Sequence, residues 1–114
     1  MADTLKQTIN ISTTSTSTEF ELVPNGVDST KTILSIIMCN TTANDCSFDM
    51  MMNGTPTGGS AGNYLIYSEQ SLPALSTFIH NSKIVVMPND HVGWRQDGTA
   101  IAGVHITTSY LDQT

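Results

Sequence analysis

The segment from Thr32 to Asn40 limits the possible folds of this chain most strongly. Its residues, Thr-Ile-Leu-Ser-Ile-Ile-Met-Cys-Asn, are of the β-branched and apolar kinds that favour strands. Side chains alternate between the two faces of a strand, which separates them into two sets: Leu34, Ile36 and Met38 on one face, Ile33 and Ile37 on the other. A strand that is apolar on both faces is covered on both, by its own core and by a loop, a second sheet or another subunit.

Several other short segments also have the composition and alternation of strands, and turn signals separate them. With the first, these expected strands cover residues 7–12, 19–23, 32–39, 47–52, 64–68, 76–80, 83–87, 91–96 and 101–111. No segment has the sustained apolar spacing of a long helix. The sequence therefore predicts an all-β fold, an antiparallel, jelly-roll-like β-sandwich of about eight strands. An immunoglobulin-like sandwich is the alternative, although its Cys-Trp-Cys framework is absent.

The chain has 114 residues, which is the usual size of one domain. Residues 1–18 hold one short strand and a Ser/Thr-rich stretch, and they are predicted to form a flexible N-terminal arm. Residues 19–114 are predicted to form a single β-sandwich domain. The first residues lack an apolar stretch after a basic one, so no secretory signal is expected, and no window is apolar for long enough to span a bilayer.

Charge excludes two classes of partner. The formal net charge is −6, with only four Lys and Arg residues in the whole chain. Nucleic-acid binding depends on many phosphate contacts from such residues, and anionic membranes repel an acidic surface. We therefore expect neither nucleic acid nor membrane as a partner.

Motifs for chemistry are missing from the sequence. The three histidines, at positions 80, 91 and 105, have no metal-ligand spacing. The glycine-rich stretch 58–62 has neither the GxSxG spacing of a nucleophile elbow nor the GK[ST] of a phosphate loop. Cys39 and Cys46 fit no zinc motif; they either form a disulfide across a hairpin or remain two free thiols. We expect no catalytic residue, no metal and no cofactor.

Four apolar residues are the candidate partner contacts: Ile33, Ile37, Met51 and Trp94. The first two form the second apolar face of the Thr32–Asn40 strand, and Met51 points away from its neighbours Met50 and Met52. Trp94 is expected in core or inter-subunit packing, with a sugar-stacking platform as the alternative.

Five segments between Thr30 and Asp112 carry a resemblance to a known group of proteins. Their patterns are S-I-x-x-C-N-T-[TS] within Thr32–Thr42, the loop end Asn63–Tyr67, x-I-P-A-x-x-T-x-x at Ser71–Ile79, K-I-x-L-x-x-G-D at Lys83–Asp90 and V-x-V-x-x-S-x-x-E at Val104–Asp112. The chain has Asn89 where the fourth pattern has Gly, and Asp112 where the fifth has Glu. In these strands and turns the chain resembles small virion structural proteins of tailed bacteriophages.

The resemblance implies a non-enzymatic bacteriophage virion structural protein, most simply a capsid decoration (cement) subunit. A neck or tail accessory protein and a glycan-binding host-adhesion module are the alternatives. It further implies a homo-oligomer whose partners are copies of itself and major capsid or neck/tail proteins. The implied location is the virion, assembled in the host bacterial cytoplasm.

Overall fold

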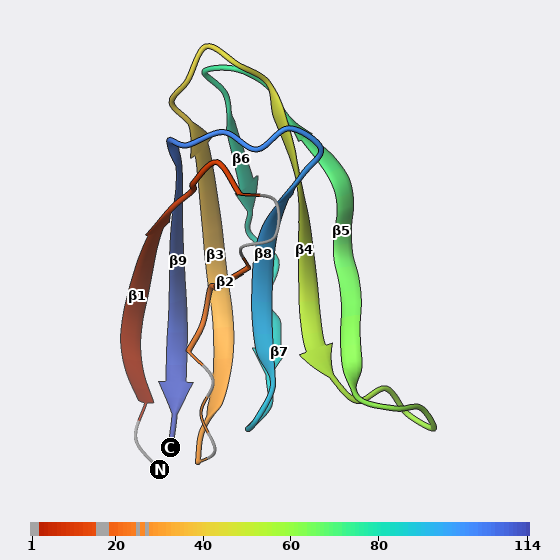
Figure 1. The fold of residues 1–114 in the computed structure, drawn as a ribbon. Helices are drawn as coiled ribbons and strands as arrows, with labels where there is room; N and C mark the ends of the chain where they lie inside the picture. Colours follow the sequence, from red (N-terminus) through yellow and green to blue (C-terminus); the bar gives the residue numbers. More distant parts are fainter. Residues whose placement is uncertain (1–2, 16–18, 25, 27) are drawn as a thin grey trace.

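The computed structural model describes residues 3–15, 19–24, 26 and 28–114. They form two antiparallel β-sheets packed face to face, and none of these residues is helical (Figure 1). The strands, in chain order, are β1 (Asp3–Ile11), β2 (Phe20–Glu21), β3 (Thr30–Asn40), β4 (Cys46–Gly54), β5 (Gly62–Leu72), β6 (Thr77–His80), β7 (Ile84–Val86), β8 (His91–Asp97) and β9 (Val104–Gln113).

The strand order confirms the predicted fold class. Sheet A has the order β1-β9-β3-β6, with β7 also paired to β3, and sheet B has the order β2-β8-β4-β5. β6 pairs with residues 36–39 of β3 and β7 with residues 31–33, so the two short strands together fill one strand position beside β3. Each sheet thus has four strand positions. The chain passes repeatedly from one sheet to the other. This is a jelly-roll-like antiparallel sandwich with about eight strand positions.

The core lies between the two sheets and is centred on aromatic side chains. Trp94 is stacked on Phe48, with ring centroids 5.6 Å apart and an interplanar angle of 24°. The indole Nε1 donates a hydrogen bond to Met38 Sδ in the opposite sheet, at 3.2 Å. Alternation on β8, with Val92, Trp94 and Gln96 facing inward, is as the sequence predicts.

A β-bulge in β3 changes the predicted assignment of its faces. The register against β9 shifts between Ile33 and Ser35, so Leu34 is an extra residue on β3. An extra residue reverses the alternation beyond it. Ile33 therefore faces the core on one side of the bulge, as Ile36 and Met38 do on the other; the prediction that Ile33 shares a face with Ile37 is wrong.

The connection between β3 and β4 joins the two sheets instead of forming a hairpin within one. β3 belongs to sheet A and β4 to sheet B. Cys39 is on the outer face of β3, opposite His105, whereas Cys46 is buried against the core in sheet B. Both thiols are free, which corrects the disulfide alternative: the two strands are not cross-strand neighbours.

The N-terminal segment is part of sheet A. β1 pairs with β9 from Asp3↔Gln113 to Ile11↔His105 without a register shift, so the strand begins before the predicted residue 7. Thr8 Oγ1 donates to the backbone oxygen of Leu22 at 2.6 Å, which ties β1 to the segment after β2. Residues 1–2 and 16–18 of the predicted arm lie outside the described residues.

Candidate assembly surface

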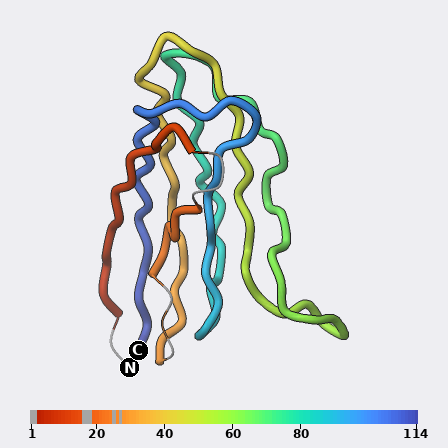
Figure 2. The backbone as a smooth tube through the Cα atoms, viewed as in Figure 1, coloured from red at the N-terminus to blue at the C-terminus, as the bar shows by residue number. Residues whose placement is uncertain are grey.

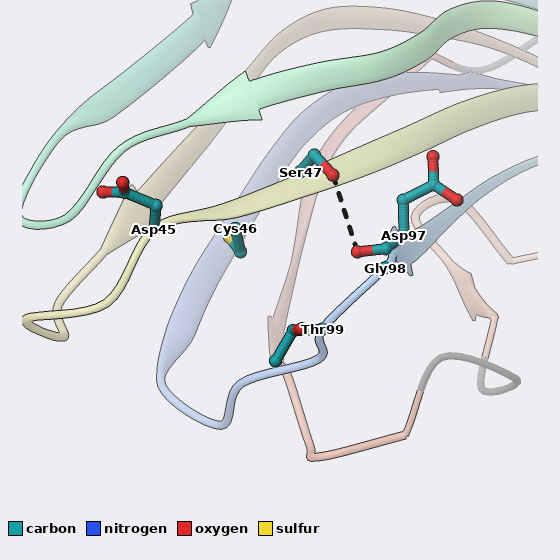
Figure 3. A pocket seen from close by; sticks show the side chains of 6 residues that line it. All are labelled: Asp45, Cys46, Ser47, Asp97, Gly98 and Thr99. Carbon is teal, nitrogen blue, oxygen red and sulfur yellow. Dashed lines mark hydrogen bonds between the residues drawn. The ribbon is translucent and has the colours of Figure 1, made fainter.

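A hollow of about 270 Å³ lies where β4 begins and β8 ends. Its lining residues are Asp45, Cys46, Ser47, Asp97, Gly98 and Thr99 (Figure 3). Ser47 Oγ donates to the backbone oxygen of Asp97 at 3.5 Å, and burial raises the pKa of the Cys46 thiol. A raised pKa keeps the thiol protonated and a weak nucleophile. No histidine is among the lining residues, so the hollow holds no paired nucleophile and imidazole base.

Two further kinds of site are missing from the described part of the chain. It contains no group of three or more His, Cys, Asp or Glu residues placed to hold a metal ion. It also contains no helix long and apolar enough to cross a membrane.

The outer face of sheet B carries charged side chains. Arg95 on β8 donates to Asp49 Oδ2 on β4 at 3.2 Å, and His91 Nε2 lies 3.2 Å from Glu19 Oε2. Asp97 lies diagonally across from Asp49, because Asp49 pairs with Arg95 and Asp97 with Ser47. β4 and β8 therefore carry ionic contacts on this face, while β5 contributes exposed Leu65.

The two aspartates on that face have pKa values shifted in opposite directions. Burial raises the pKa of Asp49, but hydrogen bonds from the Glu69 amide, Asp97 and Arg95 outweigh it, so the pKa of Asp49 lies below its ordinary value. The hydrogen bond to Asp49, followed by burial, raises the pKa of Asp97. The pair thus favours one ionised carboxylate, Asp49, and retains a proton on Asp97 to higher pH than an isolated aspartate would.

The outer face of sheet A carries apolar and uncharged side chains in rows across its strands. Residues opposite each other in antiparallel strands share a face. One row is Ile9, Thr107, Ile37 and Ile79, and a second is Leu5, Leu111, Thr32 and Val85. Between them lie Gln7, Ser109 and Ser35, and beyond the first row lie Ile11, His105, Cys39 and Thr77. We call these residues the apolar face; none is an aspartate, glutamate, lysine or arginine, and Asp3 lies at its end, beyond Leu5 and opposite Gln113.

Several side chains on the apolar face are well exposed. The exposed fraction is 74% for Leu5, 63% for Ile9, 41% for Ile37, 58% for Ile79 and 55% for Val85. Contiguous exposed apolar side chains mark interaction surfaces in soluble proteins, whereas scattered ones are ordinary. The register brings Ile37 next to Ile79 and Leu5 next to Leu111, and the residues between these apolar pairs are uncharged.

The structure places the four predicted partner-contact residues in different surroundings. Ile37 lies in the centre of the apolar face. Ile33 and Trp94 are 0% exposed and Met51 is 1% exposed, so the chain's own packing covers all three. A partner meeting this conformation reaches Ile37 alone among the four. The glycan-binding alternative also loses its platform, because it requires an exposed Trp94.

Other members of the apolar face were not predicted from the sequence. Leu5, Ile9 and Ile11 share one parity, which is a strand signal that Gln7 interrupts, and the neighbouring Ser/Thr-rich stretch favours an arm. Ile79 was placed in a strand, and only its pairing with Ile37 brings the two together. Cross-strand neighbours of this kind follow from the order in which the strands pair, and a single sequence does not reveal that order.

No protein-family model and no curated protein sequence matches the chain. Solved structures do match it. The structure of the infectious bursal disease virus Gx strain aligns at a TM-score of 0.54 and 8% identity, over 98% of this chain and 32% of that one. The VP2 subviral particle of the same virus aligns at a TM-score of 0.56 and 8% identity, over 97% of this chain and 32% of that one.

The matched proteins are viral capsid proteins, and this chain spans about a third of the length of each. At this identity the likeness establishes the fold: a jelly-roll-like β-sandwich of the kind found in viral capsid proteins. It does not extend to a tailed-bacteriophage family.

Proposed function

We propose that this chain is a non-enzymatic virion structural protein that assembles through its apolar face. The observation that carries the proposal is the difference between the two outer faces of the sandwich. Sheet B presents ionic contacts such as Arg95–Asp49, whereas sheet A presents the uncharged rows around Ile37. The centres of protein interfaces are depleted of charge in the same way.

Within that class, a capsid decoration subunit of a bacteriophage is the most specific function we propose. The sequence pattern between Thr30 and Asp112 supports it, and the capsid-type fold is consistent with it. The partners are then copies of the chain and the major capsid protein beneath it. A neck or tail accessory role uses the same surface and remains the alternative.

The experiment adds Ile79→Lys protein to particles of the encoding virus that lack the native chain. A lysine within a closed apolar contact must be desolvated or must open it, so bound protein is expected to fall at least about tenfold. Sedimentation measures the bound protein, and imaging locates its density on head, neck or tail.

Leu65→Lys is the matched control. Leu65 is 56% exposed on β5 of sheet B, against 58% for Ile79, so the two variants add the same charge to equally exposed sites. The control should bind like the native chain. Native occupancy with Ile79→Lys, or equal losses for both variants, would show that the apolar face is not the binding surface.

A further inference from the structure

The outer edge of β1 is an open sheet edge. β1 is the terminal strand of sheet A, and in the described part of the chain only β9 pairs with it. In Figures 1 and 2 this strand, in dark red, forms the outer boundary of the molecule. Its free N–H and C=O groups are a template for a further strand.

Proteins normally protect such edges, and this chain protects the long edge of its other sheet. β5, the terminal strand of sheet B, has register shifts opposite Phe48–Met50 and Met50–Met51, and Glu69 has a left-handed φ of 49°. Bulges of this kind prevent a regular ladder. β1 has no register shift over its whole length.

The one lysine on β1 does not protect its edge. Lys6 Nζ donates a hydrogen bond to Asp112 Oδ2 on β9 at 2.9 Å. The lysine side chain is therefore held toward the neighbouring strand and away from the free edge. A lysine that points outward from an edge strand would instead repel a second copy.

The orientation of the β1 amides determines which residues can pair. The amide that follows the strand, Ser12 N–H, donates to Val104 O on the β9 side at 2.9 Å. Backbone groups alternate in direction along a strand, so even-numbered residues of β1 bond to β9. Leu5, Gln7 and Ile9 consequently direct their N–H and C=O groups to the free edge.

We propose that two copies of this chain pair antiparallel through β1, around a twofold axis at Gln7. In that register Gln7 lies opposite Gln7 of the second copy, and Leu5 lies opposite its Ile9. Each of these residues has its backbone groups on the free edge, and the apolar pairs fall on the same outer face. The same residues of both copies therefore form the contact, as an isologous interface requires.

The second copy is favoured over an unrelated strand by this match. Each copy has a net charge of −6, so two copies repel each other, and the repulsion is weakest when the contacting residues are uncharged. Leu5, Gln7 and Ile9 meet that condition. Pairing also joins two apolar faces into one continuous surface. The proposal goes beyond the proposed function, and its test needs no virus particle.

The first test is the mass in solution, measured by light scattering. The native chain should have twice its 12.3 kDa monomer mass at high concentration. Gln7→Pro removes an amide of the free edge and keeps the bonds to β9, so it should be monomeric with an unchanged β circular-dichroism spectrum. Gln7→Thr keeps the amide and should remain dimeric. A monomeric native chain, or a dimeric Gln7→Pro chain, would overturn the proposal.

The second test measures the register and does not depend on proline. In a Cys39→Ser/Cys46→Ala background, Gln7→Cys places two thiols on opposed residues about 5.5 Å apart at Cα, within disulfide range. Oxidation should give a covalent dimer. Thr4→Cys, opposite Asn10, should remain uncrosslinked. Equal crosslinking of both variants, or of neither, would contradict the register.

Discussion

Asn40 is fully buried at the end of β3, and every polar atom of its side chain is used. Nδ2 donates to the backbone oxygens of Asn44 at 2.8 Å and Leu72 at 3.1 Å. Oδ1 accepts hydrogen bonds from Thr42 N–H and Thr42 Oγ1. One side chain therefore holds together the connection between the two sheets.

Replacing Asn40 with Ala should lower the free energy of unfolding by about 2–4 kcal/mol, because buried partners lose their bonds. Chemical denaturation measures the change. The control is Asn44→Ala, since exposed Asn44 contributes its backbone oxygen, and it should stay within about 0.5 kcal/mol. Equal effects of the two variants would mean that the Asn40 network contributes little.

The Asp49–Asp97 pair should make stability depend on pH. The folded-state pKa of Asp97 is raised, so ionising Asp97 weakens the fold as pH rises through that value. Asp97→Asn remains neutral at every pH. The variant should be more stable than the native chain at neutral pH, and the advantage should shrink as pH falls below the folded-state pKa of Asp97.

Thermal unfolding from pH 3 to pH 8 measures this dependence. Exposed Asp28→Asn serves as the control for removing one negative charge from an acidic chain. If Asp28→Asn gives the same profile, the effect comes from net charge and the pair is not its source.

At the scale of elements, strand positions could be predicted because alternation and turn residues are local signals. Asn89, which replaces the Gly of the resembling pattern, has a left-handed φ of 72°, a conformation that Gly and Asn tolerate best. The bulge at Leu34 could not be predicted. The segment has apolar residues at both odd and even positions, so its sequence fits a strand equally well with or without an extra residue. Residues 41–45 likewise suit a hairpin and an inter-sheet connection alike.

The sequence predicts an arm where the structure has β1, and removal of β1 tests whether this strand supports the fold. Deleting residues 1–11 removes one of the two neighbours of β9, the Lys6–Asp112 ion pair and the Thr8–Leu22 bond. At about 1 kcal/mol net for a hydrogen bond, the loss should reach several kcal/mol. Denaturation measures it; an unchanged midpoint would show that β1 is dispensable for the sandwich.

At the scale of the whole molecule, net charge should govern self-association. Raising the salt concentration from about 0.01 M to 0.15 M shortens the Debye length from about 30 Å to about 8 Å. Two copies at −6 each then repel less, while an uncharged contact loses nothing. The dimer dissociation constant should fall severalfold in analytical ultracentrifugation. A rise with salt would indicate ion pairs across the contact.

The pairing of β1 with β9 also has a consequence for synthesis. Asp3 meets Gln113, so β1 leaves the ribosome well before β9, its neighbour in the sheet, has been synthesised. Contacts so distant in sequence are associated with folding in milliseconds to seconds. During that interval β1 and the side of β3 that later receives β9 are both unpaired, and unpaired strand edges of this kind are templates for strand exchange between chains.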